Sequence, residues 1–146
     1  MTRLMTLLAL LLAAPAAAWA QAQTPAPQQA PQACQSDVAV VTSVKQDVVS
    51  LVTTIKNESE KDFETKYHQQ TCQSRLNTCL IMTNELLSCL DKAQNSAATP
   101  KTQIPAIQLL EATYTKLKNA LGKDIQGINS AKKPAKAKAL IGAFDF

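Results

Sequence analysis

The stretch CQSRLNTCLIMTNELLSCL, residues 72–90, decides the fold of this chain. Apolar and small side chains recur in it at steps of four, three, four, three and four residues: Cys72, Leu76, Cys79, Thr83, Leu86 and Leu90. This is the spacing of one face of an α-helix, and it does not fit the alternation of a strand. The stretch therefore predicts an amphipathic helix that buries this face against other helices.

Two further stripes with the same spacing lie on either side of it in the sequence. They comprise Val41, Val44, Val48, Leu51 and Ile55, and then Ile107, Leu110, Tyr114, Leu117 and Leu121. Residues 36–99 contain neither Gly nor Pro, which favours helices over a β protein with frequent turns. Residues 37–55 are rich in Val and Thr and also suit a strand, but adjacent apolar pairs break the alternation. We predict an all-α fold, a small disulfide-stapled bundle of about three helices.

The ends of these helices also leave signals in the sequence. Two motifs that resemble capping boxes predict a helix break near residue 57, namely Asn57-x-x-Glu60 and Ser59-x-x-Asp62. Phe63 and Tyr67 are expected to share a face that touches the bundle. Residues 95–102 predict a loop, and Pro105 suits the first turn of a third helix.

The first residues have the pattern of a secretory signal peptide. Arg3 precedes an apolar run over residues 4–14, and Ala18-Trp19-Ala20 is a small-x-small cleavage site. An uncleaved membrane anchor is the competing interpretation, but the run is shorter than the roughly 20 residues that a span needs. We therefore predict a signal peptide at residues 1–20 and an exported mature chain, periplasmic or extracellular.

The remaining segments differ in composition. We predict a disordered Gln/Ala/Pro-rich tether at residues 21–35, a helical bundle domain at 36–128, and a Lys/Ala-rich tail with an apolar end at 129–146. From residue 99 onward there are eight lysines and three acids, whereas residues 37–98 carry six basic and eight acidic side chains. The tail is expected to be a solubilising disordered end, or else to make weak contact with an anionic surface. The role of Phe144-Asp145-Phe146 stays open between folding back and docking on a partner.

Four cysteines are the disulfide candidates: Cys34, Cys72, Cys79 and Cys89. An even number in an exported chain favours disulfides over free thiols, and the spacing fits no short pair of zinc ligands. Residues seven or ten apart in a helix lie about 10 or 15 Å apart along its axis, so the last three cannot bond to one another within one straight helix. Two intramolecular disulfides would need a break, expected within residues 68–74. An unbroken helix would leave two thiols free or bonded to another chain.

The partner of Cys34 follows from how the first two helices face each other. A hairpin that turns at residues 57–59 brings Cys34 level with residues between Cys79 and Cys89. The sequence does not choose between these two.

The residues with catalytic potential form no recognisable motif. His68, the single histidine, precedes Cys72 by one helical turn, but an exposed histidine is the favoured interpretation over a dyad. The acids within residues 58–64 are typical of a solvated helix face. A redox role would need a Cys-x-x-Cys motif, and the few aromatic residues argue against sugar or nucleic-acid binding. We predict no enzyme, no cofactor, no metal site and no specific nucleic-acid partner.

These patterns favour a non-catalytic exported protein that binds or assembles with another protein of the cell envelope or secreted fraction. The long polar helix faces and the two predicted flexible ends motivate this expectation. The alternative is a small helical carrier of an apolar ligand held between the helices. Oligomerisation, including coiled-coil packing, stays open.

Overall fold

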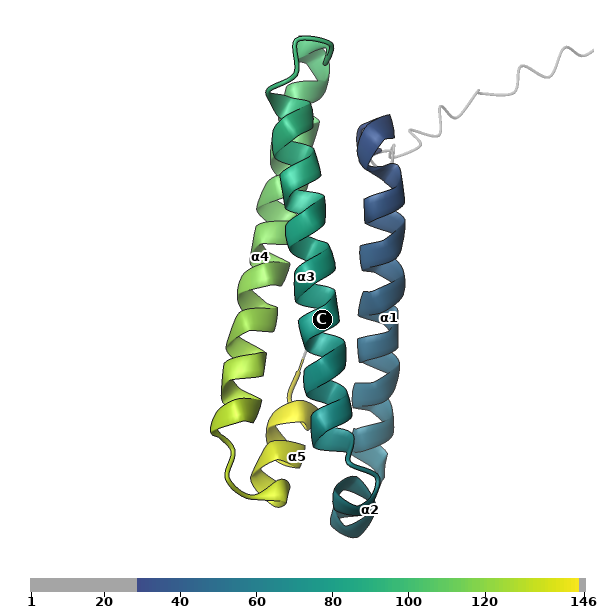
Figure 1. Cartoon of the computed structure of the whole chain (residues 1–146), viewed down its shortest axis with the longest axis vertical. Coiled ribbons are helices and arrows are strands. Elements are labelled where there is room, and N and C mark those ends of the chain that lie inside the picture. The colour runs from purple at the N-terminus through teal and green to yellow at the C-terminus, as the bar shows by residue number, and fades with distance from the viewer. Residues whose placement is uncertain (1–28, 145–146) are drawn as a thin grey trace, which may run out of the picture.

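The computed structural model describes residues 29–144 and shows an all-helical fold, with no strand among those residues (Figure 1). Its elements are η1 (Gln32–Cys34), α1 (Gln35–Asn57), α2 (Glu60–Thr65), α3 (His68–Gln94), η2 (Lys101–Gln103), α4 (Ile104–Ser130) and α5 (Pro134–Gly142). The predicted all-α bundle is confirmed. The predicted signal peptide, most of the tether and the last two residues lie outside the described residues.

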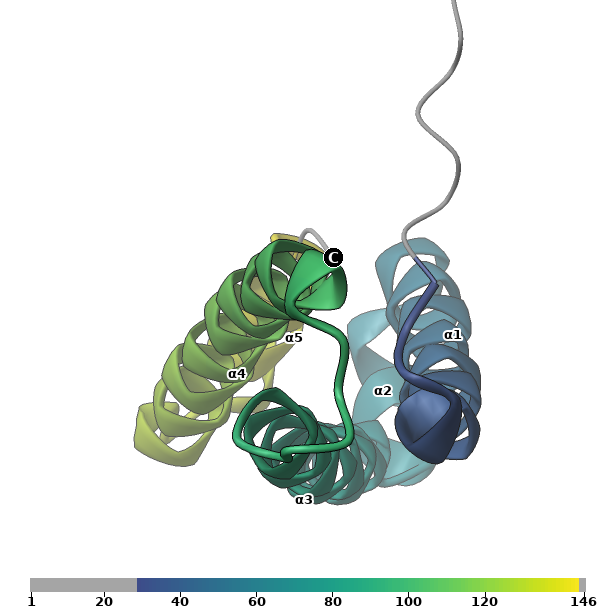
Figure 2. The same ribbon diagram turned by 90° about the horizontal axis from the view of Figure 1, so that it is seen from above.

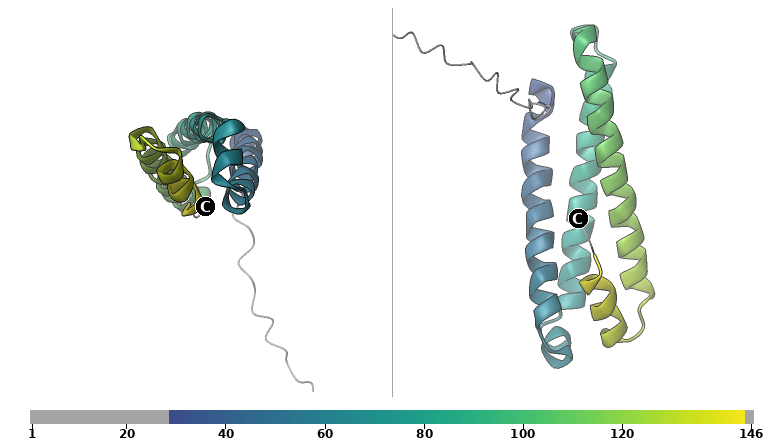
Figure 3. Two further views of the ribbon diagram at one scale, coloured as in Figure 1. Left: turned by 90° about the horizontal axis from the view of Figure 1, so that it is seen from below. Right: turned by 180° about the vertical axis from the view of Figure 1, so that it is seen from behind.

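α3 lies at the centre of the bundle, and α1 and α4 pack on it from either side (Figure 1). Seen from above, α1 and α4 diverge from α3 like the two sides of a V (Figure 2). The short helix α5 lies between α1 and α4 at the end of the bundle where α2 connects α1 to α3 (Figure 3). The other half of that space is not occupied by any helix of the described chain.

The core is made of the predicted stripes, to different extents. All six predicted positions of α3 are buried: Cys72, Leu76, Cys79, Thr83, Leu86 and Leu90. In α1 Val52 is buried, whereas the predicted Val44 and Leu51 are only partly covered. In α4 the predicted Leu110, Tyr114 and Leu117 are also partly covered. Helices cover α3 from two sides, and its predicted positions therefore match the buried residues most closely.

The connection from α1 to α3 confirms the predicted helix break. α1 ends at Asn57, and Ser59 caps α2: its Oγ accepts a hydrogen bond from the Asp62 N–H at 3.1 Å and donates one to Asp62 Oδ2 at 2.8 Å. Phe63 is buried as expected, but Tyr67 is 68% exposed. Because Tyr67 takes a left-handed conformation (φ 53°) between α2 and α3, its side chain leaves the face of Phe63.

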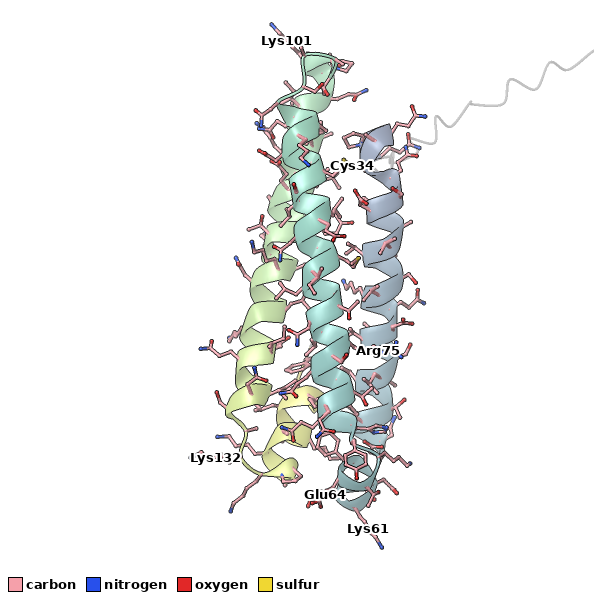
Figure 4. All side chains as sticks on the ribbon, in the orientation of Figure 1. Cys34, Lys61, Glu64, Arg75, Lys101 and Lys132 are labelled. Carbon is pink, nitrogen blue, oxygen red and sulfur yellow. A yellow bond between two sulfur atoms is a disulfide. The ribbon has the colours of Figure 1, made fainter. Side chains whose placement is uncertain are left out.

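The C-terminal segment differs from the predicted solvated tail. α4 continues to Ser130, and α5 folds back with Ala137 and Ile141 fully buried in the main core. Pro134 occupies the first turn of α5, where its missing N–H costs nothing. The two apolar residues, one turn apart, give this short helix a face to bury, while Lys136 stays exposed and Lys138 is partly covered. Lys132, at the start of this segment, projects from the lower end (Figure 4).

One disulfide joins the start of α1 to α3. Cys34 and Cys89 are bonded, with their Cα atoms 5.8 Å apart. The prediction from sequence left the choice between Cys79 and Cys89 open, because it was based on a tight turn at residues 57–59. α2 lengthens that turn, so α3 begins later and a more distant residue of α3 comes level with Cys34.

Candidate functional site

The candidate site is an open groove between α1 and α4. Both helices pack on α3, but they make almost no direct contact with each other. The groove has a volume of about 490 Å³ and a mostly apolar lining: Val41, Thr42, Lys45, Thr113, Tyr114, Lys116, Leu117 and Ala120. It is therefore formed by regular helices whose inner faces belong to the bundle core.

In the described part of the chain, the groove is the half of a fourth-helix position that α5 does not fill. In the lower half α5 contacts both α1 and α4, and it buries Ala137 and Ile141 between them. α5 ends at Gly142, and Phe144 packs against the main core. Phe144 lines the same surface pocket as Asp124, which lies one helical turn below the groove residue Ala120. Above this level no helix of residues 29–144 lies opposite α3 (Figure 3). Within these residues the row that α5 begins is thus filled only at its lower end.

The groove lining combines small side chains with Tyr114 and two lysines. Thr42 on α1 and Thr113 on α4 each donate their hydroxyl to a carbonyl one turn earlier in their own helix. Val41 and Leu117 form the floor. Because the walls are low, the floor can be reached by an apolar side chain from outside.

The charges of the groove have one sign. Lys45 from α1 and Lys116 from α4 line opposite walls, and no acidic residue is among the described residues that line it. Lys45 is partly buried, and its charge acts on the Cys79 thiol by lowering the pKa that burial raises. Burial also raises the pKa of Tyr114, so this phenol is neutral at physiological pH. The groove is apolar with a positively charged rim.

The two cysteines without a disulfide are inert core residues. Cys72 and Cys79 lie in the same unbroken helix α3 and are fully buried as thiols. Burial and the nearby Asp124 raise the pKa of Cys72 to about 12, and burial raises the pKa of Cys79 as well. Thiols with raised pKa values are poor nucleophiles. The break that we expected within residues 68–74 is absent, because α3 is continuous from His68 to Gln94. Cys72 and Cys79 therefore stay too far apart along the helix axis to bond to each other.

His68 is not the exposed histidine that we expected. Its Nδ1 lies 2.6 Å from Oε1 of Glu58, and the two side chains are only 16% and 7% exposed. The second carboxylate oxygen of Glu58 is buried without a hydrogen-bond partner in the described part of the chain. The pKa of Cys72, one turn further along α3, is raised by burial and by the nearby Asp124. The structure therefore places His68 in a contact that ties the start of α3 to the end of α1, and not in a dyad with Cys72.

Two other surface features were compared with the groove. A wider depression of about 730 Å³ lies at the upper end and is bordered by Pro31, Cys89 and the loop before η2. Glu64 and the exposed Tyr67 border a small pocket of about 340 Å³ at the lower end, from which Glu64 projects (Figure 4). The upper depression is bordered largely by turns, and the lower pocket by α2, the start of α3 and the start of α5, whereas the walls of the α1–α4 groove are two long helices.

The sequence predicted the residues at the floor of the groove, but it did not predict the groove. Leu117 and Tyr114 were predicted as ordinary core residues, and Lys45, Thr113 and Lys116 were not singled out. A signal exists in hindsight: three long helices with apolar stripes are followed by only nine residues of α5. A helix of that length cannot cover α1 and α4 from end to end.

The comparisons with known proteins gave no relative. No protein-family model matches the chain, and no curated protein or solved structure is significantly similar to it. Among the described residues, one stretch, Gln32–Asn57, is long and apolar enough by length and composition to cross a membrane, and it packs here along α3. Within residues 29–144 no cluster of three or more His, Cys, Asp or Glu side chains is arranged to hold a metal ion.

Proposed function

We propose that this chain is an exported, non-catalytic protein that binds another protein of the cell envelope or secreted fraction through the α1–α4 groove. The observation that carries the proposal is the half-filled fourth-helix position. α5 shows what kind of element this position accepts, namely a helix that inserts apolar side chains between α1 and α4. A helix from another protein laid along the open half would bury the floor residues in the same manner.

Two further features support this proposal. Leu109 lies one helical turn before Thr113 on the groove side of α4 and is 51% exposed, and Val49 lies one turn after Lys45 on α1 and is 40% exposed. Exposed large apolar side chains beside an apolar groove are typical of interaction sites. The disulfide between Cys34 and Cys89 suits an oxidising compartment, as the predicted signal peptide does.

The alternative function, an apolar-ligand carrier, has the volume of the groove in its favour. A small-molecule site, however, normally buries 70–90% of its ligand. This groove is open along the side opposite α3, so an acyl chain lying in it would stay in contact with water. A helix, which can present a polar face to solvent, fits an open groove better.

The proposal is tested by photo-crosslinking in the native compartment. A photoreactive amino acid replaces Thr42, which lines the groove, or Thr54, which is an exposed threonine of the same helix with the same hydroxyl-to-carbonyl bond. We expect position 42, but not position 54, to form a discrete crosslink to another protein. The crosslink should be lost when Ala120→Trp fills the groove. A crosslink only to lipid would instead support the carrier, and equal labelling from both positions would refute the proposed binding surface.

A further inference from the structure

We infer that the segment bound in the α1–α4 groove is an acidic amphipathic helix. This inference rests on the proposed function and specifies the chemistry of the partner. Lys45 and Lys116 stand on opposite walls, and the described lining contains no acid to neutralise them. A partner with an apolar stripe flanked by Asp or Glu on both sides would place carboxylates beside both lysines.

The length of the partner segment follows from the walls. The groove lining of α4 runs from Thr113 to Ala120, which corresponds to about 10 Å of helix. Two turns of a bound helix would cover this lining, and a helix of about 14 residues would extend beyond it by about one turn at each end. A helix of this length is only marginally stable alone and gains most of its stability on docking.

The lining specifies the apolar stripe. Thr42, Thr113 and Ala120 leave room above the floor, so the partner would supply the larger side chains, such as Leu or Ile. α5 does this in the lower half with Ile141, which is fully buried. A partner helix running in line with α5 would repeat this arrangement one level higher.

A second copy of this chain is a poor candidate for the same place. Two grooves facing each other would bring Lys45 and Lys116 of both copies together, and like charges at an interface are unfavourable. The groove of one copy also offers no protruding helix to fill the groove of the other. Charge and shape both favour a different, acidic chain.

The inference is tested with two synthetic helical peptides of about 14 residues and the folded chain. Both peptides have the same Leu/Ile stripe, and one carries Glu and the other Lys on both flanks. Binding is measured by fluorescence anisotropy at low and high salt. We expect the Glu peptide to bind at least about tenfold more tightly than the Lys peptide, with the difference shrinking as salt is added.

Charge-reversed variants show whether the groove makes this distinction. Lys116→Glu and Lys45→Glu should each weaken binding of the Glu peptide several-fold. The double variant should bind the Lys peptide more tightly than the Glu peptide. The matched control is Lys118→Glu, which changes an exposed lysine of α4 outside the groove lining. It should leave the preference for the Glu peptide unchanged. Circular dichroism checks that each variant remains folded.

The outcomes separate this inference from the proposed function. Equal binding of both peptides, or a preference that ignores Lys45 and Lys116, would overturn the acidic-helix inference. If neither peptide binds while position 42 still crosslinks to a protein, the inference fails and the proposed function stands. If neither peptide binds and no protein is crosslinked, both fail.

Discussion

Removing the disulfide should cost this chain a large part of its stability. The bond between Cys34 and Cys89 closes a loop with a sequence separation of 55 residues. The chain-entropy relation for such a loop gives about 14 cal/mol/K, or about 4 kcal/mol at 25 °C. The net stability of a domain is about 5–15 kcal/mol, so the variant Cys34→Ala/Cys89→Ala should be folded but strongly destabilised.

Urea unfolding followed by circular dichroism measures this effect. We expect the free energy of unfolding to fall by about 4 kcal/mol and the m-value to rise, because the unfolded chain without the bond exposes more surface. Cys72→Ala/Cys79→Ala is the control, since it removes two buried sulfurs without opening a loop. It should cost about 1 kcal/mol for each site. A loss below about 1 kcal/mol in the disulfide variant, or an equal loss in the control, would refute the loop-entropy reasoning.

The same perturbation should act locally on the groove. The disulfide fixes the first turn of α1 to α3, at the end of the bundle far from α2 and α5. Without it, the upper part of α1 is held to α3 by side-chain packing around Val41 and Leu86. Hydrogen exchange should therefore speed up most in the first turns of α1 and least near Ile55, where α5 and α2 close the bundle. Uniform acceleration along α1 would contradict a local role.

Three further predictions concern the lower part of the bundle. Tyr67→Gly should raise stability by about 1 kcal/mol, measured by urea unfolding, because Gly takes the left-handed conformation without strain; a loss would contradict this. The pKa of Cys72 is raised from 9.0 to about 12, so the unfolded chain loses this proton first and stability should fall by up to about 1.4 kcal/mol per pH unit as the pH rises from 9 towards 12. Cys72→Ala should remove that contribution, and an unchanged slope would refute it. Glu58→Ala should destabilise the fold by about 1–3 kcal/mol, and Glu58→Gln by less, since an amide oxygen can still accept from His68; equal unfolding free energies for the two variants would contradict the contact.

The sequence predicts α3 well because its environment is nearly symmetrical. Helices cover it on two sides, so the residues that recur every three or four positions are also those that become buried. α4 has the same pattern, but Tyr114 and Leu117 line the groove, which no helix of the described residues covers. Periodicity identifies the face of a helix that avoids water, and it does not say how much of that face a neighbour covers.

The features that sequence reasoning missed depend on distant contacts. α5 is short and carries lysines near its N-terminus, where the helix dipole disfavours positive charge. Only the burial of Ala137 and Ile141 in a core to which α1, α2, α3 and α4 contribute explains why it forms. The pairing of Cys34 likewise depends on α2, which shifts the register of α3 by its own length. Neither effect is visible in a local window of the sequence.

The instability of α5 in isolation is itself an argument about the groove. A helix of nine residues with unfavourable end charges stays folded here because it buries Ala137 and Ile141 in the core between α1 and α4. The upper half of that space has the same two walls and an apolar floor of Val41 and Leu117. An incoming helix there would meet no like charge from α5 if it carried acids in place of lysines. The property that holds the C-terminal segment in place is thus the property that would recruit an acidic partner helix beside it.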